Sequence, residues 1–176
     1  MTALRNEGKR ILHERAQALA REAVKAVIEP MLEVIEFQLA NERYAIETGF
    51  LEEVCPLKEL TPVPCTPAFV RGMINLRGRI LAVIDLKKFF ELPEGGLQDL
   101  HRVLVLRGAG LELGILADSV LGNLFLPVSA LDPELPSLTG IRAEYLKGVT
   151  SDRLAVLDAG RILSDPKIII HEEVTA

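Results

Sequence analysis

The sequence predicts a mainly β protein in which two small β-barrels share a core, with one α-helix at the N-terminus. Two observations lead to this fold class. Short apolar runs alternate with glycine and proline turns along most of the 176 residues, and many short strands of this kind are typical of small barrels. A segment that ends in LAVID at Asp85 also returns as LAVLD, which ends at Asp158. Each is followed by a short helical pattern, so two related β units are expected.

Residues 1–30 differ from the rest of the chain in pattern and in charge. Apolar side chains recur at helical spacing from Leu12 to Val27, which predicts an amphipathic helix that ends near Pro30. Residues 1–29 carry six basic and four acidic side chains, whereas the remainder carries fourteen and twenty-one. We interpret this helix as an appendage. Packing on its own domain is favoured over a dedicated partner-binding role.

The first predicted hairpin follows this helix. EVIEFQL at 33–39 and RYAIE at 43–47 alternate in polarity on either side of a short turn, which predicts two antiparallel strands. Four prolines then fall between residues 56 and 67. Because proline removes backbone donors, this stretch is expected to be a surface connection.

Three further segments complete the predicted β units. Residues 69–92 read as a strand, a glycine turn, a buried strand, an acidic stop and a short helix. Residues 102–118 place apolar runs around a glycine-rich turn, which predicts another hairpin because glycine accepts positive φ at little cost. Prolines from 127 to 136 mark a second irregular connection, and the last unit spans 145–165.

Composition argues against several classes of protein. The net charge of −5 and the absence of Trp disfavour a nucleic-acid partner. No run approaches the ~20 apolar residues of a membrane-spanning helix, and no signal peptide is evident, so a cytoplasmic protein is expected. Cys55 and Cys65 are interpreted as loop or core thiols, with a disulfide the less favoured alternative. The three histidines show no metal-ligand spacing, so neither a metal nor a cofactor is expected.

The central segment resembles the core motif of the CheW family of chemotaxis coupling proteins. Gly72, the run Asn-Leu-Arg-Gly at 75–78, an apolar strand and Asp85 followed by leucine occur in the family's order. Ala82 stands where many relatives have proline, which does not affect the expected fold. The resemblance covers about residues 32–170. Its other matching stretches are EFQLANERYAIE at 36–47, TPAFVRG at 66–72, GILADSV at 114–120 and EYLKGV at 144–149.

The resemblance implies two SH3-like, five-stranded barrel subdomains, interleaved within residues 31–171 and followed by a tail at 172–176. It also implies a non-enzymatic adaptor of a two-component signalling system, which couples methyl-accepting chemoreceptors to the histidine kinase CheA. The expected partners are the cytoplasmic tip of a chemoreceptor and the regulatory domain of the kinase. The protein would then lie near the membrane through receptor arrays without being embedded in it.

Arg77 is the central residue of the expected receptor-binding site. Its five-donor guanidinium suits a shaped polar contact, and the alternative is an arginine that bonds to carbonyls of its own turn. Leu51 and Val54 are expected at the edge of a groove for an amphipathic receptor helix, with ordinary core packing as their alternative. The resemblance favours the binding role in both cases. It implies this receptor-binding set: Leu51, Glu53, Val54, Arg71, Gly72 and Arg77.

Asn75, Gly78, Asp85 and Asp158 are expected to be structural residues of the motif. Both aspartates end related strands, where each is expected to cap the following helix. Acid and base catalysis by this pair is disfavoured because no nucleophile or metal set accompanies it. The alternative function from another class is a small-molecule-binding β-barrel, with an aliphatic pocket between its halves in which Arg77 orients an anionic ligand.

Overall fold

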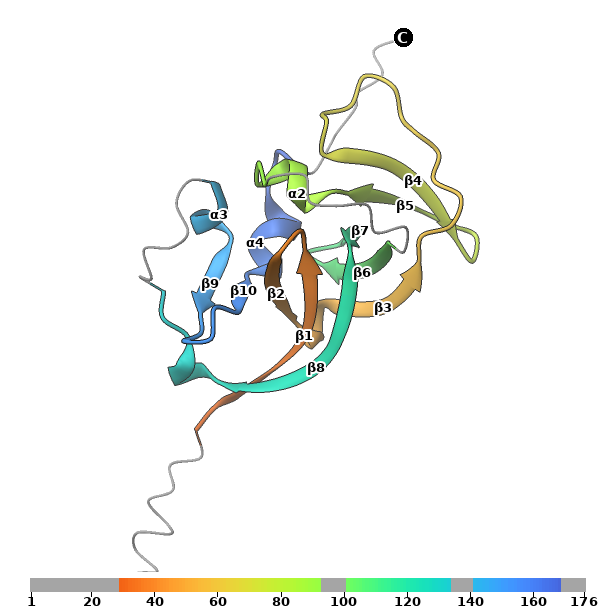
Figure 1. The fold of residues 1–176 in the computed structure, drawn as a ribbon. Helices are drawn as coiled ribbons and strands as arrows, with labels where there is room; N and C mark the ends of the chain where they lie inside the picture. Colours follow the sequence, from red (N-terminus) through yellow and green to blue (C-terminus); the bar gives the residue numbers. More distant parts are fainter. Residues whose placement is uncertain (1–28, 93–100, 134–140, 169–176) are drawn as a thin grey trace, which may run out of the picture. The chain divides into compact units, whose positions relative to one another are not determined.

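The computed structural model describes residues 29–92, 101–133 and 141–168 (Figure 1). Contacts within the chain divide it into two units, Met1–Pro30 and Met31–Ala176. The predicted N-terminal helix and the predicted tail lie outside the described residues. Every strand described below belongs to the second unit.

Ten strands in the described part of the chain form two five-stranded sheets, which we call sheet A and sheet B. Sheet A contains β1 (Met31–Leu39), β2 (Glu42–Glu47), β8 (Ser119–Pro127), β9 (Leu146–Val149) and β10 (Ala155–Leu157). Sheet B contains β3 (Leu51–Pro56), β4 (Val70–Leu76), β5 (Arg79–Ile84), β6 (Arg102–Gly108) and β7 (Leu111–Ala117). The short helical elements are η1 (Thr48–Phe50), α2 (Leu86–Phe89), η2 (Val128–Ala130), α3 (Ile141–Glu144) and α4 (Ala159–Ser164). The strand order is β8-β1-β2-β10-β9 in sheet A and β3-β6-β7-β5-β4 in sheet B.

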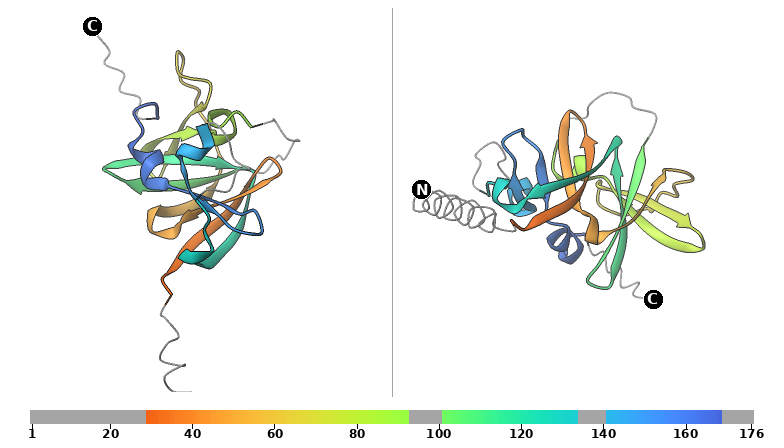
Figure 2. Two further views of the ribbon diagram at one scale, coloured as in Figure 1. Left: turned by 90° about the vertical axis from the view of Figure 1, so that its left-hand side faces the viewer. Right: turned by 90° about the horizontal axis from the view of Figure 1, so that it is seen from below.

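The strands fall into two repeats of the same order, β1–β5 and β6–β10, which exchange strands reciprocally. β3 follows the β1–β2 hairpin but pairs with β6, whereas β8 follows the β6–β7 hairpin but pairs with β1. β5 then pairs in parallel with β7, and β10 pairs in parallel with β2. Each sheet therefore takes a hairpin from one repeat and three strands from the other, as the colours in Figures 1 and 2 show. Neither sheet is formed by one continuous half of the chain.

The largest apolar cluster contains residues of both sheets, as the predicted shared core requires. Both faces of β6 are buried: Leu104 and Leu106 enter this cluster, whereas Val103 and Val105 enter a second one on the other side of sheet B. Burial on both faces explains why β6 is an unbroken apolar run. Each such leucine contributes roughly 1.5–3 kcal/mol by leaving water.

Asp85 and Asp158 cap the helices that follow the two related strands. The Asp85 Oδ1 atom accepts a hydrogen bond from the Lys87 amide at 2.9 Å, at the start of α2. The Asp158 Oδ1 atom accepts one from the Arg161 amide at 3.0 Å, at the start of α4. Both make the cap that the sequence predicts, and a cap of this kind contributes about 1 kcal/mol.

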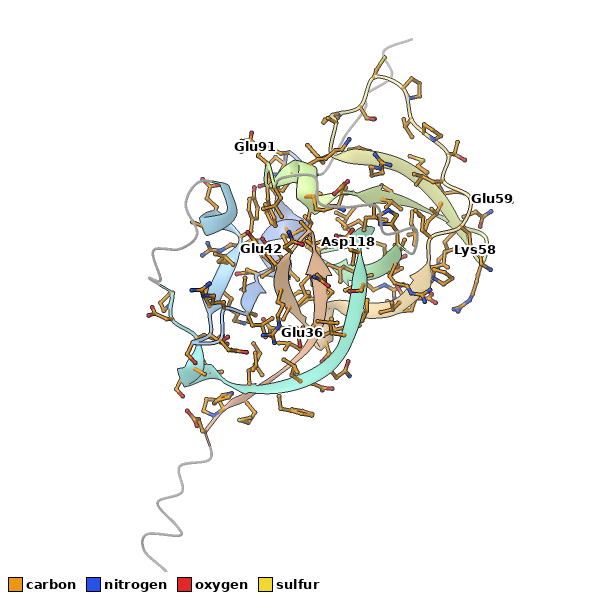
Figure 3. The ribbon with its side chains drawn as sticks, in the orientation of Figure 1. Glu36, Glu42, Lys58, Glu59, Glu91 and Asp118 are labelled. Carbon is orange, nitrogen blue, oxygen red and sulfur yellow. The ribbon has the colours of Figure 1, made fainter. Side chains whose placement is uncertain are left out.

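Asp118 lies where the chain passes from β7 in sheet B to β8 in sheet A (Figure 3). It is 5% exposed. One carboxylate oxygen accepts a hydrogen bond from Lys87 Nζ at 2.6 Å, and the other accepts one from the Ala40 amide at 2.6 Å. The Asp118 amide in turn donates to the Gln38 carbonyl at 3.0 Å. This carboxylate therefore joins the β1–β2 turn to helix α2 across the two sheets.

Strands β3 and β8 and helix α3 are absent from the predicted elements. On β8, Leu121 and Phe125 point outward and are 54% and 66% exposed, so both faces of the strand carry apolar side chains and the period of two is lost. Gly122 on the same strand also weakens a strand prediction, because glycine is unfavourable inside strands. The proline-rich stretch of residues 56–67 is mostly a connection, as predicted, although Pro56 ends β3 and Thr61 forms an isolated bridge with Met73.

Candidate partner-binding surface

The β4–β5 hairpin is longer than its counterpart in the second repeat, β9–β10. Nine residues separate Met73 from Val83, whereas six separate Val149 from Val156. The shorter hairpin still forms its ladder and still pairs with sheet A. The extra length is therefore not needed for strand pairing, and it extends the β4–β5 hairpin outward at one side of the fold (Figure 1).

Arg77 and Gly78 form the two-residue turn of this hairpin. Their φ angles are +53° and +86°, as in a type I′ turn, where both central residues have positive φ. The Asn75 side chain accepts a hydrogen bond from the Gly78 amide at 2.8 Å and stabilises the turn. Glycine suits this geometry, but the first position favours Asn, Asp or Gly. Keeping an arginine there costs roughly 1 kcal/mol of backbone strain.

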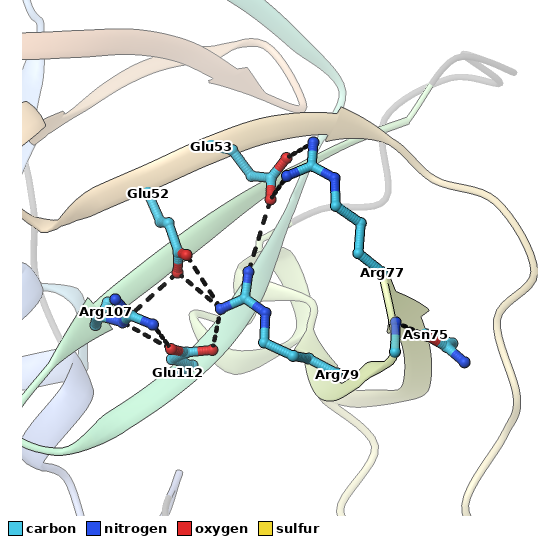
Figure 4. A network of polar contacts seen from close by, with 8 residues as sticks. Glu52, Glu53, Asn75, Arg77, Arg79, Arg107 and Glu112 are labelled. Carbon is cyan, nitrogen blue, oxygen red and sulfur yellow. Dashed lines mark hydrogen bonds and ion pairs between the residues drawn. The ribbon is translucent and has the colours of Figure 1, made fainter.

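Arg77 forms a bidentate ion pair with Glu53 (Figure 4). The Nη1–Oε1 distance is 3.3 Å and the Nη2–Oε2 distance is 2.9 Å. Glu53 lies on β3, so the pair joins the two opposite edges of sheet B. The Arg77 side chain is 76% exposed, whereas that of Glu53 is 19% exposed. Within the described residues, the hydrogen bonds of this guanidinium go to a carboxylate and not to carbonyls of its own turn.

A second arginine, Arg79, stands beside this pair within a network of charges (Figure 4). Its Nη1 atom lies 2.8 Å from Glu112 Oε2 and 3.0 Å from Glu52 Oε1. Its Nη2 atom lies 3.8 Å from Glu53 Oε1. Arg107 also binds Glu112, and its hydrogen bonds lower the pKa of the Glu112 carboxyl below its ordinary value. The network therefore spans β3, β6, β7 and β5.

The remaining residues of the predicted receptor-binding set have different environments. Leu51 is half-buried and packs against the main core, which is the alternative considered for it. Val54 is 38% exposed on β3, and Arg71 is exposed on β4. Gly72 is buried with φ +142°, and a Cβ atom there would lie 2.3 Å from the Thr61 carbonyl oxygen. This close approach of the backbone, and not an exposed surface, accounts for glycine at position 72.

A groove of about 560 Å³ lies between β3, the connection that follows it and β4. The Arg77–Glu53 pair lies on its wall. The lining mixes charged and apolar side chains of sheet B and of the connection after β3. It is therefore not the aliphatic pocket between the two halves that a ligand-binding barrel would need, and that alternative gains no support. Burial raises the pKa of the Cys55 thiol in this lining. The charged and polar residues of the groove include Glu53, Lys58, Glu59, Thr61, Asn75 and Arg77.

Two exposed apolar side chains of the hairpin were not predicted. Met73 and Ile80 are 41% and 62% exposed, although β5 is expected to be buried. The strand register pairs Met73 with Ala82 and Asn75 with Ile80, so these residues share the outer face of the hairpin. Large apolar groups beside an exposed arginine are characteristic of the centre of a protein–protein interface.

The described ranges contain no group of three His, Cys, Asp or Glu residues that could hold a metal ion. Cys55 and Cys65 are free thiols, the first half-buried on β3 and the second exposed in the following connection. Among the described helices, none combines the length and the hydropathy required to span a membrane. The features that this surface does present are a charged turn and an apolar face, both suited to contact with another protein.

Comparison with known proteins identifies a CheW-like domain over residues 33–167. The chemotaxis protein CheW of Treponema pallidum is 32% identical over 157 residues, which cover 84% of this chain and 91% of that protein. CheW of Thermotoga maritima is 31% identical over 142 residues, covering 81% and 84%. The crystal structure of the scaffolding protein TtCheW from Thermoanaerobacter tengcongensis superimposes with a TM-score of 0.69 at 27% identity, covering 81% of this chain and 94% of that one. Together with the two five-stranded sheets, this likeness confirms the predicted fold class of two SH3-like subdomains.

Proposed function

The chain belongs to the family of CheW-like chemotaxis adaptor proteins, and on this premise we propose that it joins the cytoplasmic tip of a chemoreceptor to a CheA-type histidine kinase. It acts in the cytoplasm by holding its partners, and it catalyses no reaction itself. A change in receptor conformation then alters kinase activity, because the partners make different contacts with the adaptor in the two states.

The single observation that carries this proposal is the extended β4–β5 hairpin with Arg77 at its turn. The second repeat closes its hairpin with a shorter connection, so the added length serves something other than strand pairing. The turn keeps an arginine at positive φ, with its side chain 76% exposed. Because this arginine lies on the added length beside the exposed Met73 and Ile80, binding explains it better than stability does.

The chemistry of the hairpin also indicates what it binds. Met73 and Ile80 offer an apolar face, and Arg77 offers a cation with several donors. An amphipathic helix with an acidic side chain beside its apolar stripe matches both features. The helical tip of a chemoreceptor is the partner proposed for this face, and the kinase regulatory domain is the second partner of the adaptor.

The test is the assembly of three purified components: this protein, a receptor-tip hairpin and a cognate kinase regulatory domain. Complex formation is measured by chromatography with light scattering. Arg77→Ala is expected to weaken the complex about tenfold or more, as interface arginines often do. Arg153→Ala is the matched control, because Arg153 also has positive φ, +66°, in the turn of the shorter hairpin. This control is expected to assemble like the wild type.

Circular dichroism separates the binding role from a structural one. The Arg77–Glu53 pair is exposed on the arginine side, so its loss is expected to change the free energy of unfolding by less than about 1 kcal/mol. If Arg77→Ala unfolds the protein at the concentration where assembly is lost, the arginine is structural. If the wild type forms no complex with verified cognate partners, the adaptor function itself is wrong.

A further inference from the structure

Glu53 has two arginines within ion-pair distance, although only one of them makes hydrogen bonds to it. Arg77 approaches at 2.9 Å and Arg79 at 3.8 Å. The longer distance exceeds that of a hydrogen bond but still allows strong attraction between a cation and a carboxylate. Since the Glu53 side chain is 19% exposed, its charge is costly to leave without compensation.

Arg79 is held firmly from its other side. Glu112 and Glu52 bind its Nη1 atom at 2.8 Å and 3.0 Å, and Arg107 binds both of these carboxylates. The network as a whole is neutral, because it contains three arginines and three glutamates: Arg77, Arg79, Arg107, Glu52, Glu53 and Glu112. The position of Arg79 beside Glu53 therefore does not depend on Arg77.

Arg77, in contrast, is held to Glu53 only by an exposed ion pair within the described residues. It sits at the end of an extended hairpin, its side chain is 76% exposed, and Glu53 is its ion-pair partner within the described ranges. Exposed ion pairs of long side chains are weak and exchange readily. An acidic group of a partner protein can therefore compete with Glu53 for this guanidinium.

We propose that Arg79 is the reserve partner of Glu53, which compensates the Glu53 carboxylate when Arg77 leaves it for an acidic side chain of a binding partner. Arg79 is thus a positioning residue that acts through Glu53 and Arg77 and does not itself touch the partner. The inference rests on the proposed function in one respect, because the competing carboxylate belongs to the partner. The exchange between the two arginines is a property of the adaptor alone.

The first test needs no partner and measures thermal unfolding in a double-mutant cycle. Arg77→Gln imitates the departure of Arg77. Arg79→Gln is then expected to lower the melting temperature by about 2–4 °C more in the Arg77→Gln background than in the wild type. Introducing Glu53→Gln into all four proteins is expected to abolish this difference, because the shared carboxylate is gone.

Arg43→Gln is the matched control for the stability test. Arg43 also binds two carboxylates, those of Glu36 and Asp152, and its side chain is 41% exposed. It shares no partner with Arg77 within the described residues, so its loss is expected to cost the same in both backgrounds. Equal losses for Arg79→Gln in both backgrounds would overturn the proposal, whatever the protein binds.

The second test measures affinity for the receptor-tip hairpin by calorimetry. Arg79→Gln is expected to weaken binding roughly fivefold, because freeing Arg77 then leaves a half-buried carboxylate uncompensated. Adding Glu53→Gln is expected to restore the affinity, a rescue that a merely structural role of Arg79 does not predict. Unchanged affinity in Arg79→Gln would overturn the proposal. A wild type that binds no cognate partner would refute the proposed function, while the stability test still decides on Arg79.

Discussion

Replacement of Asp118 by alanine is expected to lower the free energy of unfolding by about 3–5 kcal/mol, the usual cost of breaking a buried ion pair by removing one partner. Asp118 is 5% exposed and the Lys87 side chain is 13% exposed. The alanine variant leaves the Lys87 ammonium and the Ala40 amide without their acceptor oxygens, which now lie at 2.6 Å from each. Since small domains are stable by only about 5–15 kcal/mol, this single change removes a large part of the total.

The assay is urea unfolding followed by far-ultraviolet circular dichroism, in which the midpoint falls while the slope with denaturant stays constant. Lys87→Met alone is expected to be similarly harmful, because it leaves the carboxylate with the Ala40 amide as a donor but without its cation. The double variant Asp118→Ala with Lys87→Met is expected to cost at least about 2 kcal/mol less than the sum of the two single changes. Additive losses, or a loss below about 1 kcal/mol for Asp118→Ala, would refute the reasoning that this carboxylate ties the sheets together.

Two further predictions concern the backbone of β4 and a buried phenol. Gly72→Ala is expected to destabilise the protein by about 2 kcal/mol or more, because the new Cβ atom would meet the Thr61 carbonyl oxygen at 2.3 Å. Gly49→Ala is the control, because a Cβ atom at Gly49 would have no other atom within 4 Å. Equal melting temperatures of the two variants would contradict the prediction. The Tyr145 hydroxyl donates to Asp165, and burial, followed by this hydrogen bond, raises its pKa above the ordinary value of 10.0. The unfolded chain therefore loses this proton first, and stability is expected to fall as the pH rises above about 10. Tyr145→Phe is expected to be less stable by about 1 kcal/mol near pH 7 and to decline less steeply between pH values of about 9 and 11; parallel declines of the two melting temperatures would contradict this.

The features that the sequence predicts correctly depend on local chemistry. Asp85 and Asp158 each follow a short apolar strand and precede a helical turn, so the capping carboxylate, the strand and the helix are specified within a few residues. The hairpin at 102–118 is equally local, because its glycine-rich turn and flanking apolar runs are adjacent in sequence. These elements need no knowledge of the rest of the fold.

The partner strands of β3 and β8 depend on the whole fold and were not predicted. Each strand follows one hairpin but pairs with the other, and alternation in sequence fixes which face a strand buries but not which strand lies beside it. The pattern of polar and apolar residues is therefore the same for both topologies. The choice is made by the shared core and by the connection lengths, which no local window contains.

The candidate surface also combines features that are specified locally with features that depend on the whole fold. The exposure of Arg77 follows from a glycine turn between two strands, which the sequence displays directly. Its pairing with Glu53 joins the two edges of sheet B, across 24 positions of sequence. The partners of Arg79, Glu52 and Glu112, are likewise 27 and 33 positions away from it. Ile80 was expected to be buried because apolar alternation cannot distinguish a core face from a binding face.

The reciprocal exchange of strands bears on how an adaptor of this kind works. Since each sheet contains strands of both repeats, neither subdomain can open without disrupting the other, and the two should unfold as one cooperative unit. A protein that holds two partners at a defined separation benefits from such a unit, because motion at one subdomain is not absorbed by a hinge before it reaches the other. Asp118 connects β7 in sheet B directly to β8 in sheet A. Removing the Asp118 carboxylate should therefore weaken assembly as well as stability, even though Asp118 lies outside the β4–β5 hairpin.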